Sequence, residues 1–174
     1  MQQSVFLLLG SNRGDREQNL LKSCAGIKRS IGDILKTSPV YETEPWGFTD
    51  SIPFYNQALE VGTSLSPEEV LHEIHRIESE LGRVRELRGC EPEGSCSSET
   101  YSSRTIDIDI LFYSSRILFT DELMIPHPRL HERRFTLLPL NEIAPDFVHP
   151  VYRRAVSELL RNCTDTGEVN RVSL

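Results

Sequence analysis

The sequence lacks any apolar run that could cross a membrane. A membrane-spanning helix needs ~20 consecutive apolar residues, whereas the most apolar stretch covers only residues 5–9 and gives way at once to Gly10, Ser11 and Asn12. No basic segment of the kind found in signal peptides precedes this stretch. We therefore expect a cytoplasmic protein with no membrane partner.

An excess of basic residues is also missing. The chain has 19 Lys and Arg residues against 26 Asp and Glu residues, which gives a net charge of −7. This charge argues against general binding of nucleic acids or anionic membranes. A local group of arginines can still bind a polyphosphate, and the arginines of this chain are unevenly distributed.

Several common catalytic and binding motifs are absent. The sequence contains neither a P-loop nor a Rossmann glycine pattern, and no Ser or Cys nucleophile elbow. Its cysteines, Cys24, Cys90, Cys96 and Cys163, match no zinc spacing. Cys24 falls on the apolar stripe of an expected helix and is interpreted as a small core residue. Cys90 and Cys96 share a polar loop, where a bystander role is favoured over metal or redox pairing.

What is present is an alternation of strands and helices. We expect strands over 4–9, 34–41, 54–61 and 105–113. We expect helices between Asp15 and Gly32, between Ser66 and Gly82, around 131–138 and around 154–160. The order β-α-β-β-α-β predicts an α+β fold with a ferredoxin-like βαββαβ core, in which helices cover a mostly antiparallel sheet as an α-β-α sandwich. One domain is expected over 1–163, followed by a polar, loosely ordered tail over 164–174.

The strand over 105–113 carries the most informative pattern. Isoleucines alternate there with Asp107 and Asp109, so both carboxylates point to one face, ~6.6 Å apart. Asp is disfavoured in strands, and carboxylate oxygens are ligands that suit Mg²⁺. The alternative is an edge strand with a solvated acidic face, and the spacing alone does not decide between the two.

Arginines gather around this strand in the sequence. They are Arg83, Arg85 and Arg88 at the start of a long polar loop, Arg104 at its end, and Arg129, Arg133 and Arg134 beyond the turn over 126–128. The planar guanidinium binds two phosphate oxygens at once. Phosphoryl transfer needs carboxylates that bind metal ions beside arginines that bind phosphates. This combination favours a phosphoryl-transfer site over the alternative, a solvated loop whose charges have no function. His127, between two prolines, is a candidate phosphate donor.

A second cluster combines aromatic and polar residues over 43–46 and 54–56. An Asn flanked by aromatics could bind the edge of a flat heterocycle while rings stack on its face. Taken alone, this cluster is more typical of core packing.

In order along residues 4–150, these segments resemble the 6-hydroxymethyl-7,8-dihydropterin pyrophosphokinase family. The block Arg-Thr-Ile-Asp-Ile-Asp-Ile-Leu over 104–111 is specific to that family, and it is accompanied by Gly-Arg-Val-Arg over 82–85 and Pro-His-Pro over 126–128. The resemblance implies an ATP- and Mg²⁺-dependent diphosphotransferase of folate biosynthesis. Such an enzyme transfers the β,γ-diphosphate of ATP to the pterin hydroxymethyl group and releases AMP. The nucleophile is the substrate's own hydroxyl.

The resemblance also implies roles for individual residues. Asp107 and Asp109 would hold two Mg²⁺ ions, while Arg83 and Arg104 would contact the phosphates during transfer. The residues implied in seating ATP are Glu78, Arg85, Tyr101, His127 and Arg133. Those implied around the pterin are Thr43, Trp46, Phe54, Asn56 and Phe135. The loop over 86–103 is about eleven residues longer than in compact members, and Tyr101 stands where Trp is familiar.

Two other functions compete with this interpretation. The same aspartates could serve another two-metal phosphotransferase or a nuclease. A ferredoxin-like sheet could also bind RNA, although the Lys/Arg-Gly-Phe/Tyr strand signature is absent. No feature of the sequence indicates an oligomeric state, and a monomer that acts on small molecules is the simplest expectation.

Overall fold

The computed structural model of the protein describes residues 2–46, 52–83 and 104–173. Its elements, in order, are β1 (Gln3–Ser11), α1 (Arg16–Ser30), β2 (Asp33–Thr37), β3 (Val40–Thr43), β4 (Phe54–Thr63), α2 (Pro67–Glu80), β5 (Asp107–Tyr113), β6 (Leu118–Phe119), β7 (Met124–Ile125), the 3₁₀ turn η1 (Leu130–Glu132), α3 (Arg134–Ile143), α4 (Val156–Arg161) and β8 (Val169–Val172).

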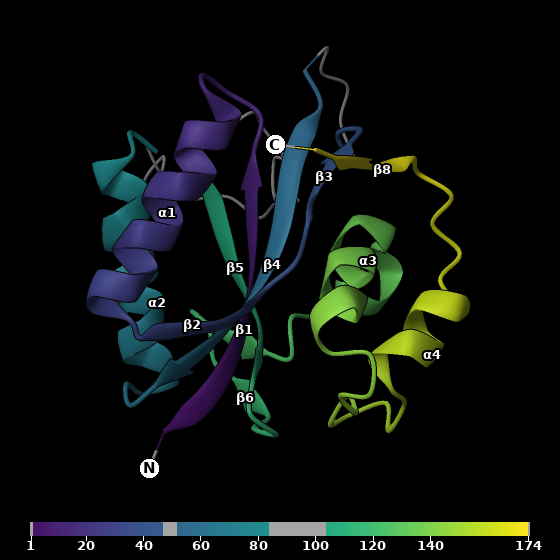
Figure 1. Ribbon diagram of the computed structural model, residues 1–174. Helices are drawn as coiled ribbons and strands as arrows, with labels where there is room; N and C mark the ends of the chain where they lie inside the picture. Colours follow the sequence, from purple (N-terminus) through teal and green to yellow (C-terminus); the bar gives the residue numbers. More distant parts are fainter. Residues whose placement is uncertain (1, 47–51, 84–103, 174) are drawn as a thin grey trace, which may run out of the picture.

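The main sheet has the strand order β5-β1-β4-β3-β8, with β2 also paired to β4 (Figure 1). Every pairing in this sheet is antiparallel. When β2 and β3 are taken as one interrupted strand, the chain from β1 to β5 follows the predicted order βαββαβ, and β5, the last strand of this unit, lies beside β1. The ferredoxin-like α+β fold is therefore confirmed.

The interruption between β2 and β3 falls at Ser38 and Pro39, inside the single strand predicted over 34–41. The Ser38 backbone N–H donates to the Ala58 carbonyl at 2.9 Å, and the Ser38 hydroxyl accepts from the Ala58 N–H, also at 2.9 Å. A side chain thus replaces one backbone partner next to a proline that has no N–H to donate. Both halves remain paired to β4.

Helices α1 and α2 begin where the sequence predicts. The Asp15 carboxylate accepts from the Gln18 N–H at 3.0 Å and caps α1. Ser66 and Glu69 form a reciprocal capping box at the start of α2, with Pro67 in the first turn. These local signals fix both helix starts without help from distant residues.

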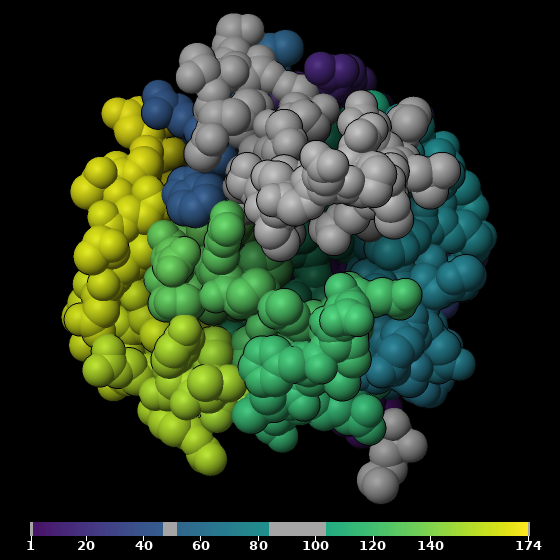
Figure 2. All heavy atoms as spheres, turned by 180° about the vertical axis from the view of Figure 1, so that it is seen from behind, coloured from purple at the N-terminus to yellow at the C-terminus, as the bar shows by residue number. Residues whose placement is uncertain are grey.

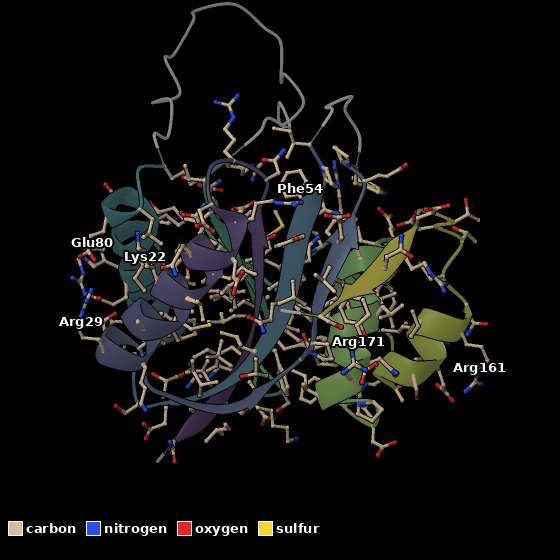
Figure 3. The ribbon with its side chains drawn as sticks, turned by 45° about the horizontal axis from the view of Figure 1, so that its top comes forward. Lys22, Arg29, Phe54, Glu80, Arg161 and Arg171 are labelled. Carbon is tan, nitrogen blue, oxygen red and sulfur yellow. The ribbon has the colours of Figure 1, made fainter. Side chains whose placement is uncertain are left out.

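Helices cover both faces of the sheet, so that two cores form. Helices α1 and α2 cover one face, and α3 and α4 cover the other (Figure 1). Because side chains alternate along a strand, Leu7 and Leu9 of β1 enter the first core, whereas Phe6 and Leu8 enter the second. On the outer surface of the first layer, labelled in Figure 3, Arg29 of α1 and Glu80 of α2 form an ion pair at 2.9 Å.

The C-terminal third differs from the prediction in two places. The helix predicted around 131–138 is a 3₁₀ turn followed by a longer helix, α3, which continues through Pro139. Proline removes one helical hydrogen bond, and Pro139 is buried on the same helix as the second-core residues Leu137 and Leu140. The tail was expected to be loosely ordered, yet residues 169–172 form β8 and pair with β3.

The hairpin of β6 and β7 was not predicted, since each strand has only two residues. Seen from behind in Figure 2, the green segment around residues 120–140 lies between the yellow C-terminal segment and the teal α2. Within the ranges that the structure describes, no helix is long and apolar enough to cross a membrane.

Candidate active site

The two aspartates of β5 lie on the sheet face that α3 covers, while the isoleucines of the same strand are buried in the opposite core. The predicted alternation is therefore confirmed. Asp107 is paired in register with Gly10 of β1, and Asp109 is paired with Leu8. Both aspartates line one pocket, together with their register partners Gly10 and Leu8.

Asp107 is held between two guanidinium groups. One of its carboxylate oxygens accepts from Arg83, and the other accepts from Arg104. Arg83 also pairs with Glu78, whose side chain is only 1% exposed and accepts from the Ile108 N–H at 2.9 Å. Burial lowers the pKa of the Arg83 guanidinium, but the charges of Asp107 and Glu78 outweigh this effect and the net pKa lies above its usual value.

Arg104 is fixed through its backbone by Asn12. The Asn12 side-chain oxygen accepts from the Arg104 N–H at 2.8 Å, and the Asn12 N–H donates to the Arg104 carbonyl at 3.2 Å. Ser11 and Asn19 both donate to the next carbonyl, that of Thr105. Side chains at the end of β1, directly after it and in α1 therefore hold the two residues Arg104 and Thr105 that lead into β5.

Asp109 has a different electrostatic environment from its neighbour. Burial raises the pKa of its carboxyl to about 7, and the nearby charge of Asp107 contributes in the same direction. The guanidinium groups of Arg133 and Arg104 oppose the shift without cancelling it. Asp107 is thus paired to arginines, whereas the pKa of Asp109 lies close to neutral pH.

His127 follows the hairpin and is held by backbone groups on both sides. The backbone N–H of His127 donates to the Leu111 carbonyl at 3.0 Å, and its ring Nδ1 accepts from the backbone N–H of Arg129 at 3.2 Å. Burial lowers the pKa of His127 to about 4, with Arg133 adding to the effect. The ring is therefore neutral at pH 7, and since Nδ1 is an acceptor, the proton is assigned to Nε2.

A pocket that is open to solvent joins the acidic pair to the aromatic cluster. Its lining consists of Leu8, Gly10, Thr43, Glu44, Trp46, Phe54, Asn56, Arg104, Asp107, Asp109, Arg133 and Phe135. All five residues expected around a pterin are among them. Figure 3 shows Phe54 at the start of β4, and this residue is part of the lining.

The polar end of the aromatic cluster is preorganised. Asn56 is 3% exposed, and its side-chain amide donates to the Thr43 hydroxyl at 2.7 Å. Gly10 makes room for this amide, because a Cβ atom on Gly10 would lie 3.1 Å from the Asn56 Oδ1. A glycine inside a strand often marks such a close approach, which is the sequence signal that could have placed Gly10 in the site.

Arg133 forms a wall together with two aromatic rings. Its guanidinium carbon lies 4.8 Å from the centroid of the Trp46 ring and 5.7 Å from that of Phe135. Arg133 is 6% exposed, so these cation–π contacts form with little water present. The wall combines a positive charge with flat apolar surface.

Some expectations concern residues outside the described ranges. Arg85 and Tyr101, predicted to help seat ATP, fall there, as do Cys90 and Cys96. Among the described cysteines, burial raises the pKa of Cys24 to about 11, which fits an unreactive thiol beside the first core. The sequence interpretation missed Leu8 and Asn12, since the role of each depends on pairing between distant strands.

The fold and the site define a ferredoxin-like α+β domain whose pocket combines carboxylates and arginines with an aromatic, amide-bearing end. Its sequence matches, over residues 6–145, the family described as 7,8-dihydro-6-hydroxymethylpterin-pyrophosphokinase (HPPK). The chain belongs to this family.

Curated relatives of two lengths match the chain. It is 39% identical over 155 residues to the 2-amino-4-hydroxy-6-hydroxymethyldihydropteridine pyrophosphokinase of Aquifex aeolicus, a match that covers 89% of each chain. It is 38% identical over 168 residues to the folic acid synthesis protein FOL1 of Dictyostelium discoideum, which covers 97% of this chain and 24% of that protein. The chain thus spans a quarter or less of the first curated relatives it matches.

Solved structures with the same fold include an HPPK-DHPS triple mutant of Plasmodium falciparum. The TM-score is 0.73 at 19% identity, and the match covers 92% of this chain and 44% of that one. At this level of identity the likeness concerns the fold. It places the ferredoxin-like arrangement described above within a known group of structures.

Proposed function

We propose that the chain transfers the β,γ-diphosphate of ATP to the hydroxymethyl group of 6-hydroxymethyl-7,8-dihydropterin, giving the pterin diphosphate and AMP in folate biosynthesis. The observation that carries this proposal is that Asp107, Asp109 and Arg104 line the same pocket as Asn56 and the cation–aromatic wall. A diphosphate donor and a flat heterocyclic acceptor would each find a suited half of the pocket. The cytoplasmic location and the monomeric state stay predictions.

The acidic pair fits magnesium. No group of three or more His, Cys, Asp or Glu side chains suited to a metal ion occurs within the described part of the chain, but Mg²⁺ commonly takes one or two carboxylates and completes its shell with substrate phosphates and water. The raised pKa of Asp109 also fits, since a nearby dication would favour the ionised carboxylate. Asp107 and Asp109 would hold two Mg²⁺ ions, which would neutralise charge on the triphosphate.

The arginines and the neutral histidine would hold the phosphates. Arg104 and Arg83 flank Asp107 from two sides, so their charges lie beside the place where phosphate oxygens would meet the carboxylates. His127 would donate from Nε2, and Glu78 would orient Arg83 through their ion pair. Arg85 and Tyr101 are included in the ATP site as expectations from the sequence alone.

The pterin would occupy the other half. Asn56 and Thr43 would bind the edge of the ring system, while Trp46, Phe54 and Phe135 would pack against its faces. Every residue assigned a role lies within 1–163, in line with the catalytic domain that we propose for that range.

The reaction needs no protein nucleophile. The hydroxymethyl oxygen of the pterin attacks the β-phosphorus of ATP, and the bond between that phosphorus and the oxygen leading to the α-phosphate breaks. AMP leaves with this oxygen, and the hydroxyl proton passes to solvent. The chain contributes by aligning the two substrates and by placing Arg83 and Arg104 where negative charge develops.

A turnover assay with ATP, Mg²⁺ and the pterin tests this function. We expect AMP to form only when the pterin is present, and EDTA to stop its formation. ADP as the product would show a simple kinase. AMP formation that is independent of the pterin would show that the acceptor is misassigned, and activity that persists in EDTA would contradict the metal assignment.

Asn56→Ala is expected to raise the KM for the pterin by roughly ten- to a hundredfold, because a buried hydrogen-bonding partner worth ~1–3 kcal/mol is lost. The KM for ATP should change little. Gln57→Ala is the matched control, since Gln57 points to the opposite face of the sheet and donates to the Ser38 carbonyl. Steady-state kinetics with each substrate varied in turn would measure the effect, and an equal rise in both KM values would contradict a pterin-specific role.

A further inference from the structure

The C-terminal segment contacts two elements that carry pocket-lining residues, β3 and α3. It leaves α4, runs along the side of α3 and returns to the sheet as β8, as the yellow trace shows in Figure 1. In β8, Val169 is paired in register with Thr43, a residue of the pocket lining. Before β8, the Asp165 carboxylate accepts from the Arg134 N–H at 2.9 Å. The segment lies beyond residue 145, where the family match ends.

Asp165 supplies a cap that α3 does not have locally. The residue at the N-cap position, Arg133, makes no side-chain capping hydrogen bond. The first N–H groups of a helix have no partner within the helix, and a carboxylate there also interacts favourably with the helix dipole. Asp165 fills this place from 31 residues along the chain. Its other oxygen accepts from the Gly167 N–H at 3.0 Å, so the carboxylate is oriented by its own loop.

The turn that Asp165 caps carries the cation–aromatic wall. Arg133 immediately precedes Arg134 and Phe135 immediately follows it, and both flanking side chains line the pocket. The Arg133 guanidinium also lies over the Trp46 ring. A shift of this first helical turn would therefore move Arg133 and Phe135 relative to the other lining residues, Asn56 among them.

We propose that Asp165 is a positioning residue for pterin binding, which acts by fixing the first turn of α3 and thereby the side chains of Arg133 and Phe135. The ligand named here rests on the proposed function. The claim that Asp165 fixes the first turn of α3 does not rest on it, because the placement of Arg133 against Trp46 can be observed without any substrate.

Three variants separate positioning from general stability. Asp165→Ala removes both acceptors, whereas Asp165→Asn keeps one side-chain oxygen that can accept from Arg134. Glu168→Ala is the matched control, because Glu168 is exposed and lies in the same segment. Trp46 is the single tryptophan of the chain, so its emission reports on this wall alone.

For Asp165→Ala we expect the KM and the calorimetric Kd for the pterin to rise about fivefold, the equivalent of one lost capping interaction. The kcat and the KM for ATP should change less than about twofold, and the emission of Trp46 in the ligand-free protein should shift. Asp165→Asn should restore the pterin constants to within about twofold of wild type. Glu168→Ala should match wild type throughout.

The outcomes distinguish the two proposals. If wild-type protein neither binds nor turns over the pterin, the proposed function fails, whereas the Trp46 emission still tests the placement of the wall. If wild type is active and Asp165→Ala has unchanged pterin constants, the positioning role is overturned. It is equally overturned if Asp165→Ala lowers Tm and all kinetic constants worsen together without rescue by Asp165→Asn.

Discussion

Replacing Asp109 by Asn is expected to abolish diphosphate transfer and, at the same time, to raise the Tm of the ligand-free protein at pH 8. The loss of activity follows from the removal of a proposed metal ligand. We expect the kcat to fall by more than ~10³, beyond the 10²–10³ that a single oxyanion donor contributes in other enzymes. The gain in stability follows from the electrostatics of the same side chain.

Burial and Asp107 raise the pKa of Asp109 from 3.8 to about 7 in the folded protein. Between these two values the folded state binds more protons than the unfolded state, so the free energy of unfolding falls as pH rises from about 4 to about 7. At pH 8 the full cost of the charged carboxylate is present, and Asn does not incur it. A gain of about 1 kcal/mol would raise Tm by roughly 2–4 °C, and the gain should vanish near pH 4.

Asp107→Asn is the matched control, since it is the same chemical change two residues away on the same face. Asp107 pairs with Arg83 and Arg104, so its neutralisation should abolish transfer yet lower Tm. Differential scanning calorimetry at pH 8 and pH 4, combined with the AMP assay, measures both effects. A wild-type kcat in Asp109→Asn would remove it from the metal site, and a lower Tm at pH 8 would show that its charge stabilises the fold.

Arg104→Ala is expected to lower kcat by about 10²–10³, because a preorganised donor beside developing charge is worth that much elsewhere. The backbone should stay in place, since Asn12 bonds the N–H and the carbonyl of residue 104 rather than its side chain. The KM for the pterin should change less than kcat. A large fall in kcat with a small change in the KM for the pterin distinguishes a role in transfer from a general disturbance of the pocket.

Two further variants sharpen the test of Arg104. Arg104→Lys keeps the charge but loses the planar fork, so an intermediate kcat is expected. Arg116→Ala removes an exposed arginine that lies over the Tyr113 ring, outside the pocket lining, and should leave kcat unchanged. A wild-type rate of AMP formation in Arg104→Ala, measured with both substrates saturating, would take Arg104 out of the catalytic assignment.

Features determined by neighbouring residues could be predicted from the sequence. Asp15 and Ser66 mark helix starts because their partners lie three residues away. The alternation in β5 placed Asp107 and Asp109 on one face because a strand has a fixed period. The pterin cluster was placed by its resemblance to a family, since core packing explains an isolated aromatic cluster equally well.

Features determined by distant residues could not be predicted in this way. Helix α3 continues through Pro139, where the local signal predicts a helix end, and its residues Leu137, Leu140 and Ile143 belong to the second core. The hydrogen bonds of Asn12 to Arg104 and of Asp165 to Arg134 join residues far apart in the chain. Their partners become neighbours only when the sheet and its helices are assembled.

The central position of β1 has a consequence for synthesis on the ribosome. Both neighbours of this first strand come later in the chain, with Val5 paired to Val61 of β4 and to Tyr113 of β5. A nascent chain therefore holds a nearly uninterrupted apolar strand with open edges until β4 and then β5 have been translated. Strand edges and apolar surface exposed in this way are where chains aggregate and where chaperones bind. Completion of the main sheet is thus expected to wait until β5 has been synthesised.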